Sequence, residues 1–263
     1  MNNSTDSSYK TGKCTICGAT RFVYSEKWKN YRCTECNSAP RQRRIHYILN
    51  KYIKDWDNIR VMEFAPINNW IMKKAKNYVA TQYYPDKKLG DKVGRFENQN
   101  IENLTCENGS YDLFLVEDIF EHIFDPQKAI SELMRSLSKN GYIIGTVPLE
   151  NKHRNKKTQK VAIIDENSKI SYIKEPRYHG NPIPTSGSLV VWEYGDDFED
   201  ILTEWVNKDG KIKFFSGPMD KYCIDRDNRS TFLIQKNVKV SSVGQSASLT
   251  QMRSQVRALF RPF

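Results

Sequence analysis

The stretch "YDLFLVEDIFEHIFDPQKAISELMRSLSKNGYIIGTVP", Tyr111 to Pro148, contains a strand, a turn, a helix and a second strand in that order. The apolar runs at its two ends lack the alternation of a strand with one wet face, so they predict parallel strands buried on both faces. Between them, Asp125 is placed as a helix N-cap and Pro126 as the first helical residue. The apolar positions that follow fall on one helical face: Ile130, Leu133, Met134 and Leu137. We expect Gly141 to end this helix as a left-handed cap.

The same alternation extends outward from this stretch in both directions. On the N-terminal side stand a strand "IRVMEF" from Ile59, a helix near Asn68 to Lys76 and a strand "YVATQYY". After Pro148 the chain turns polar and rich in turn residues, and apolar periodicity returns in "SLVVWEYGDDFEDILTEWV", "KIKFFSG" and "STFLIQK". Strands alternating with helices predict an α/β fold with a doubly wound, mostly parallel sheet, followed by a last helix and last strands.

Four of the six cysteines lie in two C-x-x-C pairs near the start of the chain. "CTIC" supplies Cys14 and Cys17, and "CTEC" supplies Cys33 and Cys36. Each pair can form a tight knuckle that directs two thiolates at one tetrahedral centre, so we expect a structural zinc site. Two disulfides or a redox dithiol are the alternatives; a reducing compartment disfavours the disulfides, and the duplicated knuckles disfavour the redox dithiol. Metal binding would supply much of the folding energy of a segment with so few apolar residues.

This N-terminal segment is also basic. Residues 1–44 carry nine Lys or Arg against three Asp or Glu, a large part of the net charge of +10. A positive surplus attracts anionic partners but does not by itself identify them. The following "PRQRRIHYILNKYI" has apolar residues on one face and is expected to form a helix that clamps the ribbon to the main domain.

The sequence therefore predicts four parts. We expect a zinc ribbon over residues 1–40, a linker helix over 41–58, the α/β domain over 59–238 with an inserted loop segment at 150–190, and a linker with an amphipathic helix over 239–263. No apolar run approaches the roughly 20 residues that cross a bilayer, and the start lacks an apolar signal core. We expect a cytoplasmic protein.

Ligands of open α/β sheets bind beyond the carboxyl ends of the strands. The residues that close each expected strand are therefore the functional candidates. They are Glu63 to Pro66, Gln82 to Tyr84, Asn98 to Leu104, and Glu117 to His122.

The stretch from Ile59 to Pro148 resembles the class I S-adenosylmethionine-dependent methyltransferases in its order of strand, "EH" turn, N-capped helix and re-entry at "NG". The wider chain resembles a bacterial branch of that superfamily, in which a four-cysteine ribbon and an "R-x-R" precede the domain and "YHGNP", "GSLV" and "G-D" follow it. The resemblance spans about residues 14 to 200. It implies a Rossmann-like methyltransferase fold, S-adenosylmethionine as cofactor, and an association with sugar or surface polysaccharide (capsule) modification.

The resemblance also implies which residues meet the cofactor. Carried onto this sequence, they are Glu63, Phe64, Ala65, Pro66, Gln82, Tyr83, Asn100, Ile101, Glu117 and Asp118. Four residues in three motifs depart from the family pattern. Ala65 and Pro66 replace a glycine-rich turn, Gln82 replaces the acid that takes both ribose hydroxyls, and Asn100 replaces an acid near the adenine amine. Amides still hydrogen-bond these groups, without the assistance of charge.

Methyl transfer to a hydroxyl benefits from a base with a pKa near neutrality, which favours histidine. His122, just beyond the strand at Glu117, and His179 in "RYHGNP" are the candidates; packing at a helix entrance and a tight turn are their alternatives. A basic run also follows Pro148: Lys152, Arg154, Lys156, Lys157 and Lys160. It is either an anchor for an anionic acceptor or a solvated loop. An ionised phosphate oxygen as acceptor would need no base.

The sequence thus predicts an enzyme that methylates an oxygen of a sugar, phosphorylated or nucleotide-linked intermediate in surface polysaccharide biosynthesis. One alternative is a nucleic-acid methyltransferase or binder that reads its target with the basic ribbon. Another is a degenerate methyltransferase fold used for binding. We expect a small-molecule acceptor, anionic or glycan, and no membrane span; nucleic acid is not favoured.

Overall fold

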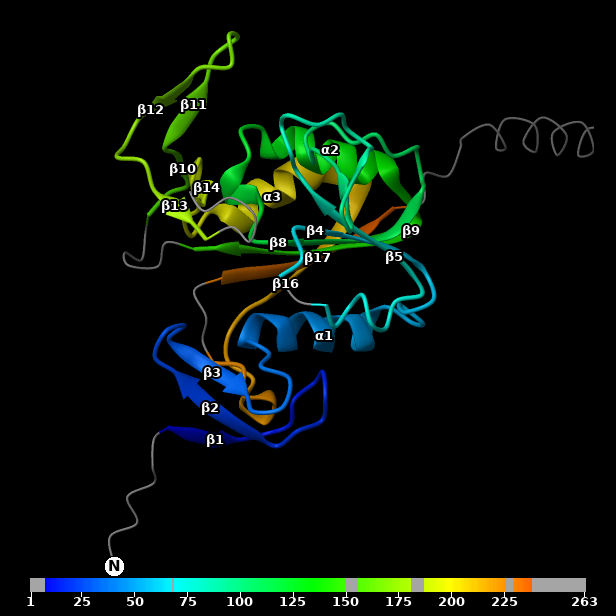
Figure 1. Cartoon of the computed structure of the whole chain (residues 1–263), viewed down its shortest axis with the longest axis vertical. Coiled ribbons are helices and arrows are strands. Elements are labelled where there is room, and N and C mark those ends of the chain that lie inside the picture. Colours follow the sequence, from blue (N-terminus) through cyan, green and yellow to red (C-terminus); the bar gives the residue numbers. More distant parts are fainter. Residues whose placement is uncertain (1–7, 68, 150–155, 181–186, 226–228, 238–263) are drawn as a thin grey trace, which may run out of the picture.

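The computed structural model describes residues 8–67, 69–149, 156–180, 187–225 and 229–237 (Figure 1). The amphipathic helix expected within 239–263 lies outside the described residues. Within them, no helix is both long enough and apolar enough to cross a membrane.

A central sheet of eight strands, counted over the described residues, has the order β16-β17-β9-β8-β4-β5-β7-β6. Its strands are β4 (Arg60–Phe64), β5 (Asn77–Gln82), β6 (Lys92–Val93), β7 (Phe96–Asn98), β8 (Tyr111–Glu117), β9 (Leu137–Pro148), β16 (Gly210–Phe215) and β17 (Arg229–Lys236). The pairings from β7 through β5, β4 and β8 to β9 are parallel, and β17 runs antiparallel to both of its neighbours. The predicted fold, a Rossmann-like methyltransferase fold with a mostly parallel sheet, is confirmed.

Helices cover both faces of this sheet (Figure 1). Successive residues of β8 point to opposite faces, so Leu113 and Leu115 pack with α1 (Pro40–Tyr52), whereas Phe114 and Val116 pack with α2 (Pro126–Ser136) and α3 (Phe198–Val206). All four side chains are fully buried. Burial of a side chain of this size contributes about 1.5 to 3 kcal/mol. Burial on both faces explains why the sequence of β8 is a continuous apolar run.

Helix α2 begins as predicted but ends differently. The side chain of Asp125 accepts a hydrogen bond from the Lys128 N–H at 2.9 Å, and Pro126 is the first helical residue. The expectation that Gly141 caps the helix is wrong, because α2 ends at Ser136 and β9 starts at once. Gly141 lies inside β9, where a Cβ would meet the carbonyl oxygen of Asp112 at 3.0 Å. Glycine there permits close approach to β8 rather than a helix cap.

The helix expected near Asn68 to Lys76 is also wrong for the described residues, which form turns from residue 69. Bonds from Lys73 N to Asn69 O (3.0 Å) and from Ala75 N to Ile71 O (2.8 Å) close single turns only. Residues 65 to 76 must return the chain from the end of β4 to the start of β5, a distance of about 16 Å for a five-residue strand. A helix of that length would use about 11 residues and leave almost none for its connections.

The N-terminal ribbon is a three-stranded antiparallel sheet of β1 (Tyr9–Thr11), β2 (Arg21–Ser25) and β3 (Asn30–Cys33). Helix α1 follows it and connects it to the main sheet; it ends at Tyr52, whereas the linker helix was expected over residues 41–58. The buried guanidinium of Arg43 donates to the carbonyl oxygens of Ser38, Tyr31, Tyr222 and Cys223. Because Tyr222 and Cys223 belong to the segment between β16 and β17, one side chain of α1 ties the ribbon to the far end of the described chain.

The segment between β9 and α3 forms small hairpins beside the main sheet (Figure 1). Their strands pair as β10 (Gln159–Lys160) with β15 (Trp192–Glu193), β11 (Ala162–Ile164) with β12 (Ile170–Tyr172), and β13 (Tyr178–His179) with β14 (Ser188–Leu189). Three 3-10 turns complete the described elements: η1 (Phe120–His122), η2 (Asn207–Asp209) and η3 (Asp220–Tyr222). The excursion expected after Pro148 is thus present in the described part of the insert.

Strand β4 leaves the sheet through Ala65, which adopts a left-handed backbone with φ of 45°. Its N–H donates to the carbonyl of Thr81 in β5 at 2.9 Å, which fixes the direction of the turn. A left-handed conformation costs an L-residue about 1 to 2 kcal/mol, and glycine avoids most of that cost. The corner therefore has the backbone of a glycine turn although no glycine is present.

We expect Ala65→Gly to leave the free energy of unfolding unchanged or to raise it by up to about 1 kcal/mol, because relief of the left-handed strain offsets the greater freedom of glycine in the unfolded chain. The matched control is Ala80→Gly in β5, whose backbone is ordinary strand and which should lose about 1 kcal/mol. Urea denaturation of both variants measures the difference. Equal destabilisation of the two variants would contradict this account of the corner.

Candidate functional site at the carboxyl edge of the sheet

The order of the strands reverses at β4, because the chain continues to β5 on one side and later to β8 on the other. Ligands bind beyond the carboxyl ends of the strands at such a switch point. A hollow lies there, with about 230 Å³ of space not filled by atoms, part of it open to solvent. Its lining residues are Gln42, Glu63, Phe64, Ala65, Pro66, Ile67, Trp70 and Glu117. Five of the residues predicted from sequence are therefore brought together.

Glu63 is buried at the floor of the hollow, with 4% of its surface exposed. Burial, and to a lesser degree the nearby carboxylate of Glu117, raises the pKa of Glu63 to about 8, although the Tyr78 hydroxyl donates to it at 2.7 Å. Glu63 is therefore protonated at neutral pH in the ligand-free chain. A cation placed beside it would favour the ionised form.

Gln82 closes β5, the strand paired with β4, and is also buried. Within the described residues, its side-chain oxygen Oε1 has no hydrogen-bond partner. A buried acceptor without a donor is costly, so this atom fits a hydroxyl donor supplied by a ligand. Tyr83 beside it is half exposed and open to the same region.

The segment from Asn98 to Leu104 offers fewer side-chain groups to a ligand than expected. The Asn100 side-chain oxygen already accepts a hydrogen bond from the Glu102 N–H at 2.9 Å, which forms a local turn. Ile101 is buried in the apolar core, as is the side chain of Phe64. Phe64 and Ile101 can therefore meet a ligand chiefly through their backbone.

Arg41 was not predicted from sequence as a site residue, yet it binds both acids that close β8. Its Nε lies 2.9 Å from Glu117 Oε2, and its Nη1 contacts Asp118 Oδ2. Asp118 also receives Arg229 Nε at 3.0 Å and the Thr146 hydroxyl at 2.7 Å. Burial alone would raise the pKa of Asp118, but Arg41 and Arg229 hold it below its usual value. The "R-x-R" motif was the available signal, but it does not show which element the arginine reaches.

The two candidate histidines come together from distant parts of the chain. His122 stands in η1 and His179 in β13, with ring centroids 5.1 Å apart. Glu121, which was not among the predicted site residues, lies against both rings. Two residues of the basic run, Lys152 and Arg154, lie outside the described residues. The same holds for Asn181, which follows His179 in "RYHGNP". Lys160 donates to the Phe124 carbonyl at 3.0 Å, and Lys157 lies 3.8 Å from Asp197.

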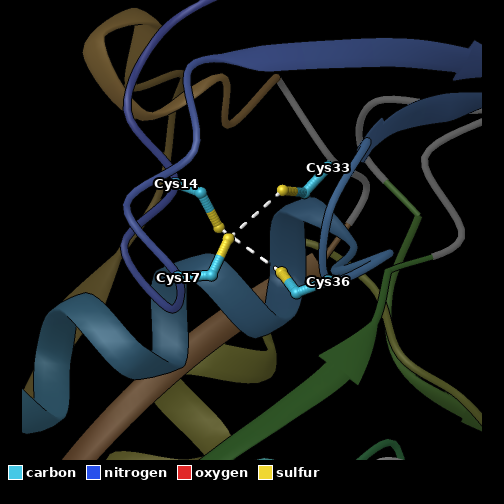
Figure 2. A group of neighbouring side chains, drawn as sticks. All are labelled: Cys14, Cys17, Cys33 and Cys36. Carbon is cyan, nitrogen blue, oxygen red and sulfur yellow. Dashed lines mark hydrogen bonds between the residues drawn. The ribbon is translucent and has the colours of Figure 1, made fainter.

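The four clustered cysteines direct their sulfur atoms at one point (Figure 2). Cys14 Sγ lies 3.6 Å from Cys36 Sγ, Cys17 Sγ lies 3.5 Å from Cys33 Sγ, and all four lie within 4.8 Å of one another. Tetrahedral zinc with bonds of about 2.3 Å needs sulfur atoms about 3.8 Å apart. The donor set therefore fits zinc.

Both C-x-x-C knuckles close in the same way. The N–H of Gly18 donates to the Cys14 carbonyl, and the N–H of Asn37 donates to the Cys33 carbonyl, each at 2.9 Å. Gly18 and Asn37 both have positive φ, the backbone that such a tight turn needs. The repeated geometry indicates two halves of one metal site.

Residues 71–145 match the family described as "Methyltransferase domain". No curated protein matches the chain significantly. Among solved structures, a S-adenosylmethionine-dependent methyltransferase from Mesorhizobium loti is 11% identical, with a TM-score of 0.47 over 73% of this chain and 97% of that one. One from Methanosarcina mazei is 13% identical, with a TM-score of 0.46 over 73% and 98%.

A third similar structure is 1,6-didemethyltoxoflavin-N1-methyltransferase from Burkholderia thailandensis, bound to S-adenosylhomocysteine. It is 11% identical, with a TM-score of 0.40 over 69% of this chain and 72% of that one. The domain match over residues 71–145, in a sheet with this strand order, supports an S-adenosylmethionine-dependent methyltransferase of the class I superfamily.

Proposed function

We propose that the chain transfers the methyl group of S-adenosylmethionine to an oxygen atom of a sugar, phosphorylated or nucleotide-linked intermediate in surface polysaccharide biosynthesis. The observation that carries the cofactor part is the buried, partnerless oxygen of Gln82 at the carboxyl end of β5, the strand paired with β4 at the switch point. The acceptor part is supported by the resemblance of "YHGNP" and "GSLV" to a bacterial branch of the superfamily.

The residues around the hollow fit the cofactor by their chemistry. Gln82 would accept a hydrogen bond from a ribose hydroxyl, and Ala65 with Pro66 presents small side chains where the chain passes close to the ligand. Glu63 would face the cationic amino-acid end, with Glu117 on the opposite wall. Tyr83, Asn100 and Ile101 would border the adenosine. Pockets for drug-sized ligands usually measure about 300 to 1,000 Å³, and this hollow encloses far less, so binding must also displace rim side chains such as the exposed Ile67.

The methyl transfer itself is a substitution at carbon. An acceptor oxygen forms a bond to the methyl carbon while the carbon–sulfur bond breaks, and the electron pair of that bond stays on sulfur. The acceptor proton, where there is one, passes to a base or to water. Most of the rate must come from holding oxygen, carbon and sulfur in line away from bulk water. His122 and His179 lie beyond β8, on the acceptor side of this arrangement.

The nucleic-acid alternative is weakened by the orientation of the basic residues. Arg43 and Arg44 are buried, and the Arg41 side chain is 13% exposed. Three of the nine positive charges counted in residues 1–44 are therefore turned inward, where they bind carbonyls and carboxylates. They serve the fold and do not face a phosphate backbone.

We propose further that Cys14, Cys17, Cys33 and Cys36 hold a structural zinc ion, since four thiolates leave no open position on a tetrahedral ion. Reduced cysteines of this kind favour the cytoplasm, where we place the protein.

Calorimetric titration with S-adenosylmethionine tests the cofactor site. We expect binding by the unmodified chain and about tenfold weaker binding by Gln82→Ala, because one hydrogen bond of about 1 kcal/mol or slightly more is lost. Gln235→Ala is the matched control, since Gln235 lies on β17 and donates to Tyr142. No heat from the unmodified chain at millimolar cofactor would show a degenerate fold. Methyl transfer to sugar nucleotides tests the acceptor class.

Glu63 should make cofactor affinity depend on pH. The cation favours the carboxylate, so below a pKa of about 8 binding must first remove a proton. We expect affinity to rise by up to about tenfold per pH unit between pH 6 and 8. Calorimetry of Glu63→Gln should show no such slope.

The protonation of Glu63 should also affect the stability of the ligand-free protein. Between about pH 4.5 and 8, the folded chain retains a proton on Glu63 that the unfolded chain has lost, so the free energy of unfolding falls as pH rises. Glu63→Gln should flatten this decline. A slope that is unchanged in Glu63→Gln would contradict the assigned titration.

Removal of one zinc ligand should release the ribbon. We expect Cys17→Ser to lower the bound zinc by one equivalent per chain and to increase amide hydrogen exchange in β1 to β3, because metal binding supplies much of the folding energy of such small units. Cys106→Ser is the matched control, since Cys106 lies outside the cluster. Atomic absorption and hydrogen exchange measure the two effects. Equal amounts of bound zinc in Cys17→Ser and Cys106→Ser would contradict the proposal that the four cysteines bind zinc.

A further inference from the structure

A second group of metal-binding side chains lies just beyond the end of β8. Glu121 and His122 belong to η1, and His179 belongs to β13. One nitrogen from each ring and one carboxylate oxygen all lie within 4.8 Å of one another. Two histidines and one carboxylate are a frequent ligand set for transition metals.

Glu121 is the unusual member of the group. Its exposed fraction is 1%, and within the described residues neither carboxylate oxygen has a hydrogen-bond partner. A carboxylate so deeply buried needs a counter-charge or donors. Glu121 points at the two imidazole rings, so whatever satisfies it must sit between them.

The distances fit a metal better than direct hydrogen bonds. Glu121 Oε1 lies 3.5 Å from His122 Nε2 and 3.6 Å from His179 Nδ1. Both exceed the normal range of a hydrogen bond. Ligands bound at about 2.0 to 2.1 Å around a tetrahedral ion stand about 3.4 Å apart, within a few tenths of an ångström of both values.

The backbone holds the group in a geometry that suits metal binding. His122 Nδ1 lies 2.8 Å from the Leu189 carbonyl oxygen, which can only accept, so Nδ1 carries a proton and Nε2 is the nitrogen turned to Glu121. Histidine ligands usually donate their second nitrogen in this way. The Glu121 carbonyl accepts the Val191 N–H at 2.7 Å, and the Phe120 carbonyl accepts the Tyr194 hydroxyl at 3.0 Å.

No arginine in the described part of the chain forms a direct ion pair with Glu121, although the Glu121 charge helps to raise the pKa of Arg41. Arg41 and Arg229 are the printed ion-pair partners of Glu117 and Asp118. In the described residues, the ion pairs of Glu121 are those with the two histidines alone. Arg41 and Arg229 thus neutralise Glu117 and Asp118. The third acid at the end of β8 is Glu121, whose charge a divalent cation would neutralise.

We propose that Glu121, His122 and His179 bind a divalent transition-metal ion with at least one open coordination position. Three protein ligands with an open fourth position are typical of catalytic rather than structural sites. The open position faces the solvent side, since His179 is 39% exposed. Zn²⁺, Co²⁺ and Mn²⁺ all suit imidazole and carboxylate ligands.

The role of this ion rests on the proposed methyl transfer. An acceptor oxygen bound at the open position would be held in place beyond β8, and a hydroxyl there would lose its proton more readily. His122 and His179 then act as metal ligands, and neither is the base.

Titration with Co²⁺ of the full chain loaded with a single equivalent of zinc, which the four thiolates of the ribbon retain, tests the metal site in the absence of cofactor. We expect one equivalent of Co²⁺ to bind with visible absorption of nitrogen and oxygen ligation, without the sulfur bands that exchange in the ribbon would give. Glu121→Gln and His122→Ala should weaken this binding at least about 100-fold, since even an outer partner of a metal ligand is worth about 10- to 100-fold. Glu193→Gln, a carboxylate held by Lys174 and Arg177, should bind like the unmodified chain.

Retention of the ribbon zinc shows that each variant is folded. Without added metal, Glu121→Gln should melt at a higher temperature than the unmodified chain, because a buried carboxylate without hydrogen-bond partners has been removed.

No Co²⁺ binding to the unmodified chain at millimolar concentration, or equal binding to Glu121→Gln, would overturn the proposal. Cofactor binding without Co²⁺ binding refutes the metal site alone, and Co²⁺ binding without cofactor binding refutes the proposed function alone.

Discussion

The carboxyl edge of the sheet gathers four acidic side chains into a poorly solvated region, and most of the site follows from how each is neutralised. Glu63 retains a proton, with a pKa of about 8. Glu117 and Asp118 share Arg41, and Asp118 also binds Arg229. Within the described residues the Glu121 carboxylate has no hydrogen-bond donor, and Arg41 acts on it only at longer range, without a direct ion pair. Parallel strands bring these residues together because their carboxyl ends meet at one edge.

Helix α1 links this edge to the zinc ribbon through two arginines two positions apart. Arg41 binds the acids of β8, and Arg43 binds carbonyl oxygens of the ribbon and of residues 222 and 223. Burial of these groups is favourable only while their partners are in place. The fold of the ribbon therefore fixes the start of α1, and the start of α1 fixes the charge balance at the site. A metal held by the four cysteines would therefore affect the site without touching a substrate.

The sequence predicted the elements whose signals are local. The apolar runs of β4, β8 and β9, the N-cap at Asp125 and the two knuckles each fall within a few residues, and all are present. Predictions failed where distant geometry decides the outcome. Gly141 serves the approach of β9 to β8, and residues 69–76 lack the length for a helix antiparallel to β4. Glu121 was passed over because its lack of partners is visible only once β13 and β14 are in place.

The two halves of the proposed reaction are connected by the few residues that follow β8. Glu117 lines the hollow, and Glu121, four residues later, faces the histidines. The residues between are held firmly: Asp118 by two arginines and Thr146, and Phe120 by Tyr194. In-line transfer tolerates little misplacement, so this short segment must be rigid for both halves to work together. The left-handed backbone of Asp118, at φ of 50°, makes the turn between them, and its ion pairs offset the strain.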